Sequence, residues 1–159
     1  MNKFLKLAAS ITICEGTGFL GSIFTISSIT GWYSTLNKPF FNPPNWIFGP
    51  VWAALYLLMG MSLFLVWENK KKNKNYKSAL ILFFVQLVLN FLWSILFFGL
   101  HSVFFASQEI IILWIFILFT IINFLRVSRA AGLILIPYAL WVGFATVLNF
   151  SILLLNRIA

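Results

Sequence analysis

Acidic residues are almost missing from this chain: among 159 residues, only Glu15, Glu68 and Glu109 are acidic. Charged residues of both signs amount to 9% of the sequence, whereas a soluble domain has roughly 25%. Hydrophobic residues amount to 62%, against a usual range of about 45–50%. Because so few charges cannot form a surface that faces water, the composition excludes an ordinary soluble domain and predicts an integral membrane protein.

Cysteine and histidine are equally scarce, since Cys14 and His101 are the single residues of their kinds. A lone cysteine excludes a disulfide bond within the chain and every zinc-binding spacing of cysteines. His101 lies at the end of a predicted span, where we expect it at the surface. The sequence offers no set of metal ligands, no activated nucleophile and no acid–base pair. We therefore expect no metal site, no required cofactor and no conventional catalytic residues.

The formal net charge of +8 does not indicate nucleic-acid binding. Five of the eleven basic residues lie in the short stretch 70–77, between two apolar runs. This clustering is the usual topological signal of a membrane protein. No basic face with an element that could enter a groove is present, so a nucleic acid is not an expected partner.

Five apolar runs are long enough to cross a bilayer, which takes about 20 largely apolar residues. They are predicted at about 4–28, 45–67, 78–100, 104–125 and 130–155. The first run is too long for the apolar part of a signal peptide, so we interpret it as a retained helix. The chain is thus predicted to be one all-α domain, residues 1–159, formed by a bundle of five transmembrane helices. Most connections are short, so neighbouring helices should run antiparallel.

Basic residues are divided unequally between the two ends of this predicted bundle. The amino-terminal end and the connections 68–77 and 126–129 contain two, five and two of them, whereas the connection 29–44 and the carboxyl terminus contain one each. The positive-inside rule therefore places the amino terminus and the loop 68–77 in the cytoplasm and the loop 29–44 outside.

Proline and tryptophan are concentrated between residues 32 and 52, which hold four of the five prolines and three of the seven tryptophans. Proline fixes φ and has no N–H to donate, and it keeps the preceding residue out of the α region. The segment before Asn45 is therefore predicted to be stiff, extended and non-helical. Asn45 is a plausible N-cap of the second helix, and Pro50 falls near its first turn.

Aromatic and amide side chains recur at helical spacing in three of the spans. These stripes are Phe48, Trp52 and Tyr56; Gln86, Asn90 and Trp93; and Tyr138, Trp141 and Ala145. Such stripes commonly serve packing, and an amide in hydrocarbon must find a partner, which an interhelical hydrogen bond would supply. Alternatively, the three stripes face one another and form an apolar pocket with a few polar anchors, the general form of a small-molecule site. Pro137 is expected to kink the fifth span.

The first span contains a carboxylate, Glu15, followed by Gly16, Gly18, Gly21 and Ser22. Small residues at this spacing allow helices to approach closely. A carboxylate within a span is costly and usually faces the protein interior. Glu15 is therefore either a structural acid, protonated or paired, or a polar group that lines a cavity.

Several ordered motifs connect these features. They are Trp32-Tyr33, Leu36-Asn37-Lys38-Pro39, Phe41-Asn42-Pro43-Pro44-Asn45-Trp46, Phe48-Gly49-Pro50-Val51-Trp52, Leu92-Trp93-Ser94 and Pro137-Tyr138-Ala139-Leu140-Trp141. With them the chain resembles, over essentially its full length, the TspO/MBR family of tryptophan-rich sensory or translocator proteins. The resemblance implies a five-helix membrane bundle, often a homodimer. We expect it in a bacterial plasma membrane. It also implies binding of tetrapyrroles, such as protoporphyrin IX and haem, and of flat aromatic synthetic ligands.

The resemblance further implies which residues form the site. The family's ligand pocket falls on Tyr33, Pro43, Phe48, Trp52, Tyr56, Gln86, Asn90, Trp93, Trp141 and Ala145. Its lid falls on the loop 29–44, with Trp32, Lys38, Pro39, Asn42 and Pro44. Two departures matter: Phe48 enlarges one wall, and the basic residue of the animal sterol motif is missing after Asn149, so sterol binding is not expected.

Three functions remain in competition. The first is tetrapyrrole binding for transport, sensing or a stress response, with the ligand's propionates met near the mouth by Asn42, Lys38 or loop N–H groups. The second is light- and oxygen-dependent porphyrin degradation, implied by the resemblance, in which Trp52 and Trp141 would act. The third is a structural or partner-binding bundle whose stripes are packing alone.

Overall fold

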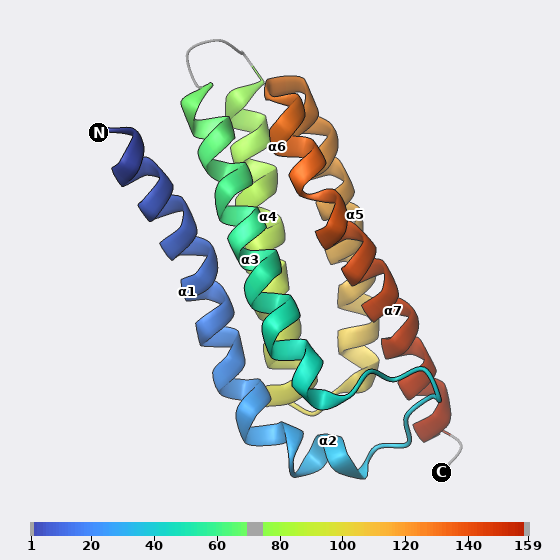
Figure 1. The fold of residues 1–159 in the computed structure, drawn as a ribbon. Coiled ribbons are helices and arrows are strands. Elements are labelled where there is room, and N and C mark those ends of the chain that lie inside the picture. Colours follow the sequence, from blue (N-terminus) through green and yellow to red (C-terminus); the bar gives the residue numbers. More distant parts are fainter. Residues whose placement is uncertain (1, 70–74, 158–159) are drawn as a thin grey trace.

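A computed structural model describes residues 2–69 and 75–157 of the chain (Figure 1). Its elements are α1 (Lys3–Ile29), α2 (Trp32–Thr35), α3 (Asn45–Glu68), α4 (Tyr76–Ser94), η2 (Ile95–Gly99), α5 (Val103–Val127), α6 (Arg129–Ile134) and α7 (Ile136–Arg157). Figure 1 shows the long helices side by side, with α2 and the loop after it across one end of the bundle. Five segments are long and apolar enough to cross a membrane, so the predicted all-α fold with five spans is confirmed.

The third span is not α-helical throughout, which the sequence did not predict. After Ser94 the chain continues as the π-helix η2, and the Leu100 N–H donates to the Ile95 carbonyl, five residues earlier, at 2.7 Å. Single π-turns at the end of an α-helix are often found at functional sites. Here η2 holds Phe97, which is 2% exposed, edge-on to Trp32 of α2 at 5.4 Å between ring centroids.

The fifth span is interrupted, as Pro137 predicted. A turn at Leu135 separates α6 from α7, and Pro137 lies in the first turn of α7. Proline cannot donate a hydrogen bond to the carbonyl four residues earlier, so the helix is broken on the amino-terminal side of this residue.

The loop 29–44 departs from its prediction in two places. Trp32–Thr35 forms the helix α2, because it precedes the prolines and the Lys38 ammonium donates to the last carbonyls of its turn, Tyr33 O and Leu36 O, each at 2.8 Å. The prediction of a wholly non-helical segment is therefore wrong for α2. Helix α3 begins at Asn45 as predicted, but Pro44 occupies the N-cap position and the Asn45 side chain makes no capping hydrogen bond.

Charged side chains join α1 and α3 at the end of the bundle opposite α2. The Lys6 ammonium lies 2.6 Å from one carboxylate oxygen of Glu68, and that of Lys3 lies 3.9 Å from the other. Lys70, Lys71, Lys72 and Lys74 of the predicted cytoplasmic loop lie outside the described residues.

Glycines bring α1 and α3 into close contact. A methyl group at Gly60 would lie 2.7 Å from the Ile11 Cα atom, and one at Gly18 would overlap the ring of Tyr56. Gly21 also faces a neighbour, Ser94 of α4, with its Oγ 3.0 Å from the position of a Cβ. The expected packing role is confirmed for Gly18 and Gly21 and is wrong for Gly16, which has no neighbour within 4 Å of a Cβ.

We predict that Gly60→Ala lowers the free energy of unfolding by about 1–3 kcal/mol, because the methyl group meets backbone that cannot rotate away. The matched variant Gly16→Ala adds the same group in open space and should leave stability unchanged or raise it, since alanine favours the helix. The measurement is the midpoint of SDS-induced unfolding. Equal effects of the two substitutions would contradict the close crossing.

Candidate functional site

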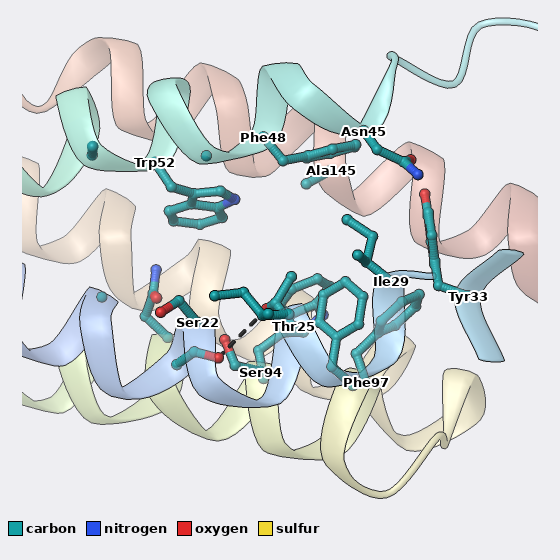
Figure 2. Close-up of a pocket in the computed structure, with 18 of the residues that line it drawn as sticks. Ser22, Thr25, Ile29, Tyr33, Asn45, Phe48, Trp52, Ser94, Phe97 and Ala145 are labelled. Atoms are coloured by element: carbon teal, nitrogen blue, oxygen red, sulfur yellow. Dashed lines mark hydrogen bonds between the residues drawn. The ribbon is translucent and has the colours of Figure 1, made fainter. Parts of the chain in front are cut away.

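A cavity of about 530 Å³ lies in the half of the bundle next to α2. It is enclosed by α1, α2, α3, α4 with η2, and α7. Figure 2 shows Phe48 and Trp52 on one side of the space, Ser22, Thr25, Ser94 and Phe97 on the other, and Tyr33 and Asn45 at its lid end. This volume falls in the range of about 300–1,000 Å³ that small-molecule sites occupy. The interior is therefore not filled by its own side chains.

Most of the predicted site residues border this cavity. The eight that line it are Tyr33, Phe48, Trp52, Tyr56, Asn90, Trp93, Trp141 and Ala145. Pro43 and Gln86 are not among the lining residues. The three predicted stripes therefore face a common space, whereas a ligand-binding role for their residues stays a prediction.

Ring contacts hold the aromatic walls in place. Trp52 is tilted against Tyr56 at 5.7 Å between centroids and edge-on to Tyr138 at 6.4 Å. Trp93 stacks on Phe97 at 5.1 Å, and Phe48 meets Trp141 edge-on at 6.2 Å. Offset and edge-to-face pairs are the favoured arrangements of aromatic rings. The rings of the wall thus hold one another in place, and Tyr138 supports Trp52 from outside the lining.

A buried chain of hydrogen bonds closes the inner end of the cavity. The Tyr56 hydroxyl donates to Asn90 Oδ1, Asn90 Nδ2 donates to the Tyr138 hydroxyl at 2.8 Å, and that hydroxyl donates to Gln86 Oε1 at 2.8 Å. Gln86 and Asn90 are 1% and 3% exposed, so both amides depend on these partners. Interhelical hydrogen bonding, one of the two interpretations of the amides, is therefore confirmed. These hydrogen bonds hold Gln86 outside the lining of the cavity, whereas Asn90 makes its hydrogen bonds and also lines the cavity.

Helix α1 supplies a wall that the sequence analysis did not include in the site. Five of its eight lining residues recur every three or four positions along the helix: Glu15, Gly18, Ser22, Thr25 and Ile29. This spacing was visible in the sequence, but small and hydroxyl residues are equally typical of plain helix packing. Of the two interpretations of Glu15, lining a cavity is the one that the geometry supports.

The lid is fastened to the bundle by polar contacts. The Asn37 N–H donates to Asn156 Oδ1 at 3.0 Å, and Asn156 Nδ2 donates back to the Asn37 carbonyl at 2.9 Å. Trp32 stacks on His101 at 4.5 Å, with Nε2 of the imidazole 3.2 Å from the Ser28 hydroxyl. His101 is exposed as expected, but it also packs against the lid.

Polar side chains of the lid are bonded within the lid itself. The Tyr33 hydroxyl donates to Asn42 Oδ1 at 2.9 Å, and Asn42 Nδ2 donates to the Pro43 carbonyl at 3.0 Å. Burial raises the pKa of the Tyr33 hydroxyl and the bond to Asn42 offsets part of that rise, so the phenol stays protonated at neutral pH. None of Trp32, Lys38, Pro39, Asn42 and Pro44 lines the cavity. Contact of Lys38 or Asn42 with a ligand's acid groups stays a prediction.

We predict that Tyr138→Phe lowers the free energy of unfolding by about 1–3 kcal/mol, because it leaves Asn90 Nδ2 and Gln86 Oε1 buried without partners. Ser151→Ala is the control, since the exposed Ser151 hydroxyl bonds only to the Val147 carbonyl of its own helix. It should change stability by less than about 0.5 kcal/mol. SDS-induced unfolding measures both. A Tyr138→Phe protein as stable as the Ser151→Ala protein would show that the chain of bonds does not hold the helices.

Comparison with known proteins places the sequence in a family. The sequence model of the TspO/MBR family matches residues 10–155. The chain is 49% identical over 154 residues to the tryptophan-rich protein TspO of Archaeoglobus fulgidus, covering 97% of this chain and 99% of the relative. It is 46% identical over 157 residues to the protein of the same name from Chlorobaculum tepidum, covering 98% and 99%. The human translocator protein is 34% identical over 149 residues, covering 91% and 87%. The chain therefore belongs to the TspO/MBR family of membrane sensory and translocator proteins.

Proposed function

We propose that this protein binds tetrapyrroles, such as protoporphyrin IX and haem, and other flat aromatic molecules in its cavity, and that it acts in their transport or sensing. The observation that supports this most is the meeting of Trp52, Trp93 and Trp141, from three different helices, around one cavity. A porphyrin offers a large π surface to such walls, and each ring contact contributes about 0.5–1.5 kcal/mol beyond the burial of area.

The border of the cavity suits a ligand that arrives through the bilayer. On α1, Phe19 and Ile26 line the cavity and are 69% and 71% exposed, and on α3 Trp46 is 73% exposed. Exposed lining residues on both helices mean that the cavity reaches the side of the bundle between α1 and α3. A hydrophobic ligand dissolved in hydrocarbon would meet it there without crossing the lid.

The lining also favours recognition by the face of the ring. Among the described residues that border the cavity there is no histidine, cysteine or methionine. We therefore expect haem to be held by its porphyrin plane, as protoporphyrin IX would be.

We further propose a homodimer in the plasma membrane of a bacterium, with the amino terminus and the loop 68–77 in the cytoplasm and the lid outside. This orientation is supported by the excess of basic residues at the end of the bundle that holds the amino terminus and the loop 68–77. Figure 1 shows the amino terminus and α6 at one end of the bundle and α2 with the carboxyl terminus at the other, as five spans require.

We predict that Ala145→Phe weakens protoporphyrin IX binding at least tenfold, because the added ring occupies the cavity beside Trp141. Val147→Phe is the matched control: Val147 lies on the same helix but is 58% exposed on its outer side, so affinity should stay within twofold. Quenching of tryptophan fluorescence by protoporphyrin IX in detergent measures the affinity. Failure of the unsubstituted protein to show saturable quenching would leave only the structural or partner-binding function.

A second candidate function, light-driven degradation of the bound porphyrin, is favoured by the position of Trp52 and Trp141 in the cavity wall. We predict that illumination of the complex under oxygen consumes protoporphyrin IX more slowly in Trp52→Phe and Trp141→Phe than in the unsubstituted protein. Trp67→Phe is the control, since Trp67 does not line the cavity. Absorbance of the Soret band measures the loss, and equal rates in all four proteins would remove this function.

A further inference from the structure

Glu15 is the only formally charged residue among the described residues that line the cavity. It lies near the middle of α1, on the helix face that borders the cavity. Ile29, at the lid end of the same wall, is fourteen residues further, about 21 Å along the helix axis. The carboxylate therefore marks the end of the cavity that is remote from the lid.

Glu15 has no partner of its own, in contrast to Glu68. Glu68 is paired with Lys6 at 2.6 Å, whereas no ion pair or hydrogen bond to the Glu15 carboxylate occurs in the described parts of the chain. The hydroxyls that line the same wall are already engaged: Ser22 donates to the Phe19 carbonyl at 2.7 Å and Thr25 to the Gly21 carbonyl at 3.4 Å. Among the described residues of the lining there is no lysine, arginine or histidine that could neutralise the acid.

An unpaired carboxylate in a membrane interior is costly, and a cation or N–H donor placed against it offsets that cost. A hydrogen bond from a charged donor is also about twice as strong as a neutral one. A ligand carboxylate at the same place would be repelled, because no basic group among the described lining residues is there to screen the two negative charges.

We propose that Glu15 is a specificity-determining residue that selects flat aromatic ligands carrying a cationic amine or amidine, with the charged nitrogen at the end of the cavity remote from the lid. This inference rests on the proposed function, because it requires a flat ligand between the tryptophan walls. It also orients a tetrapyrrole: the edge that carries the propionates points toward the lid, away from Glu15. The cavity thus selects for charge as well as for a flat shape, since it excludes ligands that would place an acidic group next to Glu15.

The test compares three acridine probes of nearly equal shape by quenching of tryptophan fluorescence. These are 9-aminoacridine, a cation at neutral pH; acridone, which is neutral; and acridine-9-carboxylate, an anion. Glu15→Gln, which keeps the size of the side chain and removes its charge, should weaken 9-aminoacridine at least tenfold and leave acridone within twofold. Glu109→Gln is the matched control, because Glu109 is a second carboxyl within a span, 6% exposed, that does not line the cavity. It should leave all three affinities within twofold.

The inference is overturned if Glu15→Gln changes 9-aminoacridine and acridone equally, if it changes neither, or if Glu109→Gln has the same effect as Glu15→Gln. Should Glu15→Gln fail to fold, the test uses the unsubstituted protein alone. It must bind 9-aminoacridine at least tenfold more tightly than acridine-9-carboxylate, and equal affinities refute the selection.

Binding of protoporphyrin IX distinguishes failure of this inference from failure of the proposed function. Saturable protoporphyrin binding with no charge preference among the acridines refutes the role of Glu15 alone, whereas absence of binding by protoporphyrin IX and acridone refutes the proposed function itself.

Discussion

One buried chain of hydrogen bonds, from Tyr56 through Asn90 to Tyr138, fixes the three helices that carry the tryptophan walls. In hydrocarbon no water can replace a lost partner, so each of these helices has one rotation that satisfies its polar side chain. Trp52 precedes Tyr56 by one helical turn on α3, and Trp93 and Trp141 follow Asn90 and Tyr138 by about one turn. Since α3 runs away from the lid and α4 and α7 run toward it, all three indoles lie one turn closer to the lid than the polar chain. The bonds that join the helices thus also aim the rings at one space.

Helix α1 and the lid complete the enclosure by different means. Helix α1 crosses α3 at glycines, where Gly60 meets Ile11 and Gly18 meets the ring of Tyr56, and beyond that contact its small and hydroxyl residues face the cavity. The lid is held by two reciprocal hydrogen bonds between the backbone of Asn37 and the side-chain amide of Asn156. Packing therefore closes the inner half of the bundle, and a few polar contacts close the outer half.

The sequence predicted those features of fold and site that depend on local pattern. The five spans, the start of α3 at Asn45, the break before Pro137 and the common orientation of the three stripes all follow from hydrophobic length, proline chemistry and a period of 3.6 residues. The π-turn η2 could not be predicted, because one residue more per turn leaves no compositional signal. Helix α2 was missed because its stability comes from Lys38, which caps it from outside the turn.

The different roles of the two amides depend on contacts between helices. Gln86 and Asn90 lie one turn apart on the same helix face, so the sequence gives them equal claims to the cavity. The structure separates them: Gln86 accepts from the Tyr138 hydroxyl and does not line the cavity, whereas Asn90 bonds to the same hydroxyl and also lines the cavity. Position along a helix predicts the direction of a side chain, but its contacts also depend on the residues of the neighbouring helices.

The most direct test of this account is an experimental structure of the protein with protoporphyrin IX. The account predicts the porphyrin plane between Trp52, Trp93 and Trp141, one turn toward the lid from an intact Tyr56–Asn90–Tyr138 chain of hydrogen bonds. A porphyrin bound on the lipid-facing surface, or a cavity that stays empty beside it, would contradict the claim that this polar chain aims the three indoles at a ligand.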